Sequence, residues 1–291
     1  EEGGSRRASF SLGAPLSEML GFRLTGNIAK TDSDAWDINR NHASTRTGIF
    51  AGTFPAGREG VRNRDLDARL SLKANAQHRL DLDASFSRQG DTQNTNNYTT
   101  LPNGQLAPPS RRVQEALGSE TNRIYRSNYA LTHTGRYEGG ASSSAYVQHE
   151  ITRNERMDEG LAGGTEGLFS TGNLSTTLHG EYNQPGKWGS LDHVITLGLE
   201  GVHQRFDDPN SVSQATTEGG TIAGLASTGR SSKVSAKIYS VFVEDNIELT
   251  PETILTPGVR FDHHSKAGNN WSPSLNLSHN LTREITLKAG V

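Results

Sequence analysis

The sequence predicts an all-β fold, an antiparallel transmembrane β-barrel to which this chain contributes about twelve strands. Three observations lead to this prediction. Apolar and polar residues alternate along most of the chain, the alternating stretches are longer than ordinary strands, and the connections between them switch regularly between short and long. Helical periodicity is scarce, so we expect almost no helix.

The alternation is clearest in the segment "RLDLDASFS" at residues 79–87. A period of two places alternate side chains on opposite faces of a strand. A charge at the bilayer midplane costs about 2 to 4 kcal/mol for Arg or Lys, so acidic groups are not expected there either. We therefore expect the apolar set to face lipid, namely Leu80, Leu82, Ala84 and Phe86. Asp81 and Asp83 should face the lumen.

The connections between the expected strands alternate in length along the chain. Short ones fall near 14–19, 76–78, 137–140, 183–190, 250–252 and 281–283, and long polar ones at about 37–61, 93–121, 158–171 and 207–232, with a shorter one near 265–271. The strands between them run for roughly 9 to 17 residues, against about 5 to 6 in an ordinary strand. A soluble sandwich has short strands and connections of mixed length. Long tilted strands with short turns at one end and long loops at the other are typical of an outer membrane barrel, with the long loops outside the cell.

Composition supports this architecture and excludes several others. Of the 291 residues, 32% are hydrophobic, which is low for a packed core but fits a barrel with a polar lumen. The 29 basic and 32 acidic residues nearly balance, so nucleic acid is not an expected partner. Cysteine is absent, which excludes disulfides and thiolate metal sites. The ends, "EEGGSRRASF" and "EITLKAGV", read as cuts within a longer protein, so we expect an internal piece.

A possible metal site occurs in "RFDHH", where Asp262, His263 and His264 are adjacent. A catalytic metal site needs about three ligands converging on one point. Because neighbouring strand residues point to opposite faces, His263 and His264 cannot both reach one ion, and we expect a polar strand end instead. No Ser-His-Asp pattern with strand–turn–helix context is present, so we predict no catalytic residues, no metal site and no enzyme.

Arginines at the borders of strands and long loops are the strongest candidates for ligand binding. Taken singly, each is ordinary solvated charge. Taken together at one mouth of a barrel, with Tyr98 and Tyr125 among them, they would attract an anionic aromatic ligand by charge steering, bidentate hydrogen bonds and cation–π contact. The set comprises Arg123 and Arg126 on one strand, Arg153 and Arg156 on the next, and Arg58, Arg62, Arg64, Arg111 and Arg112 around the loops.

Several stretches resemble the TonB-dependent outer membrane receptors for ferric enterobactin and related catecholate siderophores. They are "FPAGREGV" (54–61), "SRQGDTQNTN" (87–96), "ETNRIYRSNYALT" (120–132), "TRNERMDEGLAGGTEG" (152–167) and "TPGVRFDHHSKAGNNWSPSLNLSHNLT" (256–282). The resemblance implies a plugged barrel of about 22 strands, of which residues 1–291 would be a partial barrel domain without the plug and without the C-terminal strands.

The resemblance also implies function, site and partners. It suggests import of a ferric catecholate siderophore with energy from TonB, ExbB and ExbD, with iron carried as substrate and no resident cofactor. By motif position, the resemblance implies that Arg126 and Arg156 contact the ligand and that Tyr98 matches a loop aromatic of the family. Outer membrane lipid is an expected partner, and the resemblance leaves room for colicins or phage.

Residues 99–119 depart from the enterobactin-receptor pattern, so a related catecholate is an alternative ligand. Two other classes stay open, namely a porin-like or adhesin barrel and a barrel enzyme active at its rim.

Overall fold

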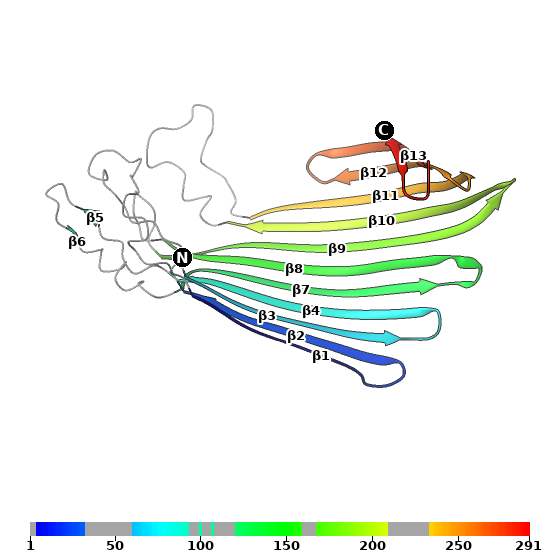
Figure 1. Ribbon diagram of the computed structural model, residues 1–291. Coiled ribbons are helices and arrows are strands. Elements are labelled where there is room, and N and C mark those ends of the chain that lie inside the picture. The colour runs from blue at the N-terminus through cyan, green and yellow to red at the C-terminus, as the bar shows by residue number, and fades with distance from the viewer. Residues whose placement is uncertain are drawn as a thin grey trace, which may run out of the picture.

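A computed structural model describes residues 4–32, 60–92, 99–100, 106–107, 120–158, 167–208 and 233–291. Twelve strands form one sheet, and they pair in an up-and-down meander in which all neighbours are antiparallel (Figure 1). The strands are β1 (Ser5–Pro15), β2 (Leu20–Thr31), β3 (Gly60–Lys73), β4 (His78–Thr92), β7 (Glu120–Arg136), β8 (Ser142–Asp158), β9 (Gly167–Trp188), β10 (Leu191–Asp207), β11 (Lys233–Thr250), β12 (Thr253–His264), β13 (Gly268–Asn280) and β14 (Thr286–Gly290).

The remaining regular structure is small. Strands β5 (Thr99–Thr100) and β6 (Leu106–Ala107) form a separate two-stranded pair within the connection between β4 and β7. A three-residue 3₁₀ turn, η2 (Glu138–Gly140), joins β7 to β8. The predicted all-β meander of about twelve strands is therefore confirmed.

The short and long connections alternate as predicted as far as β12, but not beyond it, and two connections differ from the prediction in detail. The turn expected at 183–190 is only Gly189 and Ser190, because β9 continues through Pro185 opposite Val194. The pairing with β8 ends at Asn183, so Pro185 lies at a free edge, where a missing N–H is tolerated. The connection expected at 265–271 shrinks to three residues, and Gly268 supplies a positive φ of 88° at the start of β13.

Each strand presents one apolar and one polar row, and the register aligns these rows across the sheet into an apolar face and a polar face. On β3 and β4, Leu70 lies opposite Leu82. On the other face, Arg69 donates from Nε to Oδ1 of Asp83 at 2.6 Å, and Asp81 accepts hydrogen bonds from Ser71 and Arg79. Asp81 and Asp83 thus lie on the polar face and Leu82 on the apolar one, as the alternation predicted.

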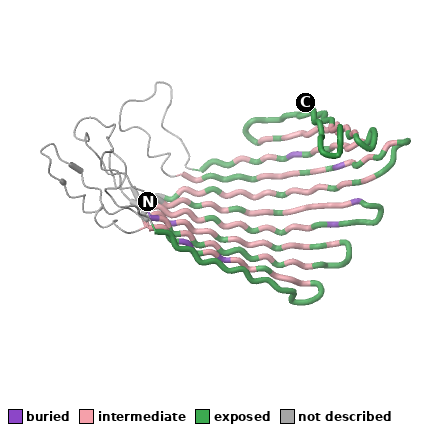
Figure 2. The backbone as a smooth tube through the Cα atoms, in the orientation of Figure 1, coloured by how far each residue is buried: buried purple, intermediate pink, exposed green. Residues whose placement is uncertain are grey.

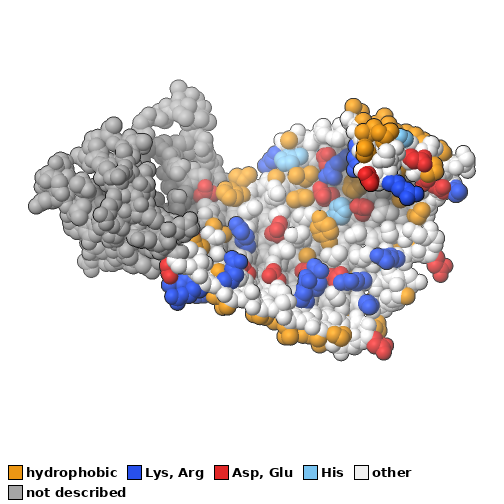
Figure 3. Space-filling model, in the orientation of Figure 1, with side chains coloured by type: hydrophobic (Ala, Val, Ile, Leu, Met, Phe, Trp, Pro, Cys, Tyr) orange, Lys and Arg blue, Asp and Glu red, His pale blue; other side chains and the backbone are white. Residues whose placement is uncertain are grey.

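The sheet has almost no core of its own. Among the described residues, Ala29 and Ala141 are the only buried hydrophobic side chains, and most positions are exposed or half-buried (Figure 2). Large side chains of the apolar face stay open, with Leu82 51% and Val241 56% exposed. Charged side chains are spread over the face visible in Figure 3, while hydrophobic ones line its lower edge. Such a sheet needs a surrounding apolar phase on one side.

Among the described residues, no helix is long and apolar enough to cross a membrane.

Candidate ligand-binding site

Arg126 lies on the polar face of β7, near the end of the sheet where the long connections emerge. Its neighbours across the ladder are Ser87 on β4 and Thr152 on β8. The side chain is exposed, and it makes no hydrogen bond or ion pair with any other residue that the structure describes. A free guanidinium in this position is available to a bound anion.

A cavity of about 410 Å³ opens beside Arg126 on the polar face. Three carboxylates line it, those of Asp65, Asp67 and Glu150. Asp65 is tied down locally, because it accepts hydrogen bonds from Nδ2 of Asn27 at 2.8 Å and from Oγ of Ser87 at 2.7 Å. Arg126 is the only cation among the lining residues, so it is the one group of this cavity that could attract an anion.

Position 156 lies on the same face of β8 as Thr152, because the two are an even number of residues apart. Thr152 is the cross-strand partner of Arg126. The backbone of position 156 pairs with Asn122 on β7 and with Phe169 on β9. Four residues separate it from Thr152, which is roughly 13 Å along a strand. The register thus brings positions 126 and 156 to the polar face, with 156 nearer the long connections.

Arg123 and Arg153 do not join Arg126. The register pairs Arg123 with Glu155 and Tyr125 with Arg153, and these positions alternate with those of the polar face. Both arginines therefore lie on the apolar face. There the Arg153 guanidinium stacks over the Tyr125 ring, 4.6 Å from its centroid, and Nε of Arg153 lies 3.1 Å from Oε1 of Glu155. The four arginines divide between two faces instead of converging.

Of the other candidates, Arg62 and Arg64 lie on the apolar face of β3, where Arg64 pairs with Arg88, so they do not join Arg126 either. The rest cannot be placed. Tyr98, Arg58, Arg111 and Arg112 lie outside the described residues.

The residues of "RFDHH" all have local partners. Asp262 accepts hydrogen bonds from Ser240 and Arg260. His263 Nδ1 lies 2.6 Å from Oδ1 of Asn269, and His264 Nδ1 accepts the backbone N–H of Ala267 at 2.9 Å. In the part of the chain that the structure describes, no group of three or more His, Cys, Asp or Glu side chains is arranged to hold a metal ion.

A mixed aromatic and charged cluster on the polar face was not predicted. His179 stacks on Tyr146 with ring centroids 5.2 Å apart, and its Nδ1 lies 3.7 Å from Oε2 of Glu200. Arg260 reaches the same Glu200, with Nη2 3.0 Å from Oε1, and lies 5.9 Å from the centroid of Phe242. These residues come from strands β8 to β12, and no local pattern in the sequence links them.

Comparison with known proteins agrees with the β-barrel fold. The family model described as TonB dependent receptor-like, beta-barrel matches residues 5–291. The ferric enterobactin receptor of Pseudomonas aeruginosa is 53% identical over 303 residues, covering 100% of this chain and 39% of the receptor. The ferrienterobactin receptor of Escherichia coli is 46% identical over 100% of this chain and 40% of that protein. The chain thus spans about two fifths of the length of these relatives.

Solved structures give the same result. A variant of the Pseudomonas aeruginosa ferric enterobactin receptor in complex with enterobactin has a TM-score of 0.82 at 52% identity, covering 99% of this chain and 41% of that one. The siderophore receptor PirA of Acinetobacter baumannii has a TM-score of 0.78 at 35% identity, covering 99% and 40%. The predicted outer membrane location is confirmed by these relationships. With a match along nearly its whole length, the chain belongs to the TonB-dependent receptor β-barrel family.

Proposed function

We propose that this chain forms part of an outer membrane receptor that binds a ferric catecholate siderophore of the ferric enterobactin type. The receptor would import it with energy from TonB, ExbB and ExbD. The observation that carries the proposal is the exposed Arg126, which has no partner among the described residues, on the polar face of a barrel whose named relatives are ferric enterobactin receptors. The chain would supply part of a barrel of about 22 strands, and the plug and the remaining strands would come from the rest of the protein.

In a membrane, the two faces of the sheet take different surroundings. The apolar face meets lipid and the polar face lines the lumen. Arg126, and by its register position Arg156, would then face the path of a ligand entering from outside. Tyr98, from the loop between β4 and β7, would add an aromatic surface. Arg123 and Arg153 would contribute only long-range charge, since they lie on the lipid side.

The chemistry of the ligand fits such a site. A ferric tris-catecholate is a large anion with flat rings, and a guanidinium keeps its charge at any relevant pH and stacks on a ring. Histidine or carboxylate ligands would compete with the catechols for iron, so the binding site should hold the complex through the siderophore alone. Iron would pass through as part of the substrate, and no resident cofactor is required.

Two other classes of barrel are less well supported. A porin-like or adhesin barrel with no dedicated ligand would not need a cation left without a described partner on the polar face, and a rim-active barrel enzyme would need a catalytic group beside the cavity. The relatives named above are ferric enterobactin receptors.

The test is a binding titration of ferric enterobactin against the purified full-length receptor. Replacing Arg126 and Arg156 together by Ala should weaken binding on the order of a hundredfold or more, because each removes a charge-assisted contact of about 1.5 to 3 kcal/mol. The matched control replaces Arg123 and Arg153, which removes the same charge from the other face and should change affinity less than about threefold.

A second control replaces His263 and His264 by Ala and should leave affinity nearly unchanged. Critical histidines with silent arginines at 126 and 156 would overturn both the site and the mechanism. Equal losses in the two arginine pairs would show that net charge, not the lumenal position, determines affinity.

A further inference from the structure

The apolar face changes character abruptly toward the end of the sheet that bears the long connections. Three successive cross-strand rows show this on β1 to β4. The first row contains Phe10, Gly26, Leu66 and Phe86, the second Ala8, Ile28, Arg64 and Arg88, and the third Arg6, Lys30 and Arg62. Each row is two residues, or roughly 7 Å, further along the strands. The apolar face therefore passes from hydrophobic to basic within about 14 Å.

The basic zone continues on the neighbouring strands. Arg123 on β7 and Arg153 on β8 lie on the same face and at the same end. We call the whole set the basic rim, which comprises Arg6, Lys30, Arg62, Arg64, Arg88, Arg123 and Arg153.

Nearby carboxylates neutralise only part of the basic rim. Glu120 forms an ion pair with Arg88 and lies 3.9 Å from Nη1 of Arg62 and 3.8 Å from Nε of Arg123. Glu155 is shared between Arg123 and Arg153. Two carboxylates thus serve four guanidinium groups.

The cations on the first strands are less compensated. Lys30 contacts Asp32, with Nζ 2.5 Å from Oδ1. Arg6 and Arg64 are exposed, and within the described residues neither forms an ion pair. The rim therefore carries an excess of positive charge where β1 to β3 meet.

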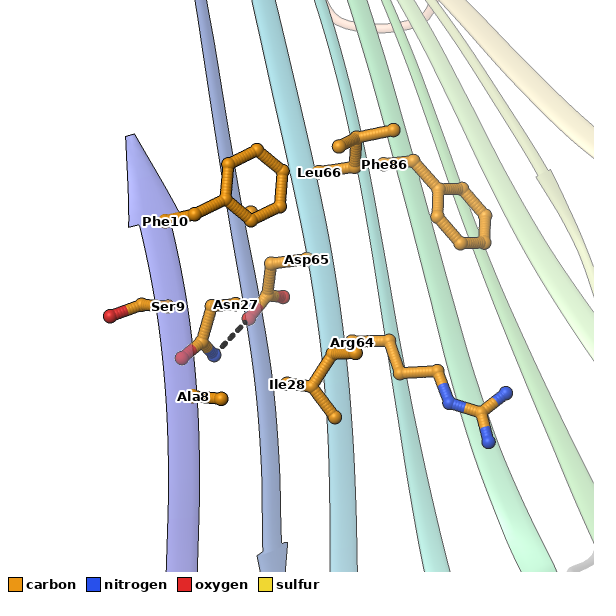
Figure 4. A pocket seen from close by; sticks show the side chains of 10 residues that line it. Ala8, Ser9, Phe10, Asn27, Ile28, Arg64, Asp65, Leu66 and Phe86 are labelled. Atoms are coloured by element: carbon orange, nitrogen blue, oxygen red, sulfur yellow. Dashed lines mark hydrogen bonds between the residues drawn. The ribbon is translucent and has the colours of Figure 1, made fainter. Parts of the chain in front are cut away.

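An apolar groove lies directly below this excess. It has a volume of about 400 Å³ and is lined mainly by side chains of the first two rows. In Figure 4, Phe10, Leu66 and Phe86 lie in one row, with Ala8, Ile28 and Arg64 in the next. Gly26 shapes the groove, because a Cβ there would lie 2.3 Å from the Phe10 ring, so only glycine lets this ring lie across β2.

We propose that the basic rim and this groove form a binding site for a phosphate-bearing lipid of the outer leaflet. One acyl chain would occupy the groove, and the phosphate would lie on Arg64, Arg62 and Lys30. Guanidinium groups bind phosphate through paired, charge-assisted hydrogen bonds. Charged side chains on a lipid-facing surface extend toward the headgroup layer, which is where the end of the apolar row places them.

Ordinary loop charge does not account for this arrangement. The rim residues belong to regular strands and alternate with positions of the polar face, so they cannot turn into the water-filled lumen. Free phosphate would use the cations but would not need the groove, and a neutral lipid would use the groove but not the cations. A phosphorylated lipid uses both.

The experiment uses the full-length receptor in an uncharged detergent and native mass spectrometry to count bound lipid. The probes are lipid A with both phosphates, the same lipid with both phosphates removed, and inorganic phosphate. We expect lipid A with phosphates to bind at least about tenfold more tightly than the dephosphorylated form, and millimolar inorganic phosphate not to displace it.

Three variants separate the contributions. Arg62→Gln with Arg64→Gln should weaken lipid A binding about tenfold or more while leaving ferric enterobactin affinity within about twofold. That second measurement shows that the variant is folded. Ala8→Phe fills the groove without changing charge and should weaken lipid A binding about threefold or more. Arg126→Gln, at the same end of the sheet but on the polar face, should change lipid A affinity by less than about twofold.

Wild-type lipid binding by the Arg62/Arg64 variant would overturn the proposal. So would equal binding of the two lipid forms, or displacement by inorganic phosphate. Because lipid and siderophore are measured separately, a failure of this site is distinguishable from a failure of the siderophore site.

Discussion

Replacing Leu82 by arginine tests which face of the sheet meets lipid. The apolar row on β4 runs from Leu80 to Phe86, between the turn at one end and Arg88 at the other, so Leu82 lies near its centre. Its cross-strand neighbours are Leu70 and Leu131, and both are exposed on the same face. An arginine there would have no acidic partner across either ladder.

The cost follows from the position in the membrane. Arginine on the lipid face of a barrel destabilises by about 2 to 4 kcal/mol at the midplane. That corresponds to roughly a 30- to 1,000-fold change in the folding equilibrium constant. The matched control is Ser85→Arg, three residues further along β4 on the polar face, beside Asp67 in the cavity described above. There the new charge has water and a carboxylate nearby, so we expect less than about 1 kcal/mol.

The assay is denaturant titration of the full-length receptor refolded into lipid vesicles, with the free energy of unfolding compared among wild type and the two variants. A silent Leu82→Arg, or a Ser85→Arg that costs as much, would show that the faces have been assigned the wrong way round.

Two further predictions concern packing and turns. Gly198→Ala should destabilise the protein by about 1 to 3 kcal/mol, because the added Cβ would lie 1.9 Å from the Phe242 ring. Gly180→Ala should be nearly neutral, because the atom nearest to its added Cβ is 3.6 Å away. Thermal denaturation of both variants checks this prediction, and equal effects would contradict it. His264→Ala should destabilise the protein by about 0.5 to 1.5 kcal/mol, because it removes the acceptor for two backbone N–H groups of the β12–β13 turn. Thermal denaturation would detect this loss. An unchanged stability would show that water replaces the imidazole as acceptor.

The fold could be predicted from the sequence because a strand needs only local information to choose its faces. Asp81 and Asp83 alternate with Leu82 along the strand. A sheet with one face in water and the other in an apolar environment must therefore place the two Asp side chains on one face and Leu82 on the other. The sequence predicts a broad turn at 183–190 because Pro185 and Gly186 are turn residues by type, whereas β9 continues to Trp188. Whether they end a strand depends on the neighbouring ladder, which stops at Asn183 and so leaves Pro185 at a free edge.

The site was only partly predictable, for a reason of the same kind. Motif position predicts Arg126 and Arg156 as ligand contacts. Adding Arg123 and Arg153 to them assumes that all four side chains lie on one surface at the mouth of the barrel. The odd spacing between 123 and 126 already assigns them to opposite faces of a regular strand. Glu120 breaks that rule, because the register shifts between Asp91 and Thr92 and brings it to the face of Arg123. A bulge of this kind leaves no mark in the sequence.

The arginines at the loop-bearing end of this barrel therefore fall into two sets with different physical surroundings. On the polar face, Arg126 is exposed and has no hydrogen-bond or ion-pair partner among the described residues, so its guanidinium would be free for the anion that we propose. On the apolar face, Arg123 and Arg153 are held by Glu155, and Tyr125 packs against Arg153. If the apolar face meets lipid, as we propose, these contacts would hold the guanidinium groups at the loop-bearing end of that face, toward the headgroup layer. On our proposals, the same residue type at one end of the same strands would serve a soluble anion on one face and the membrane on the other, because a single step along a strand moves a side chain between them.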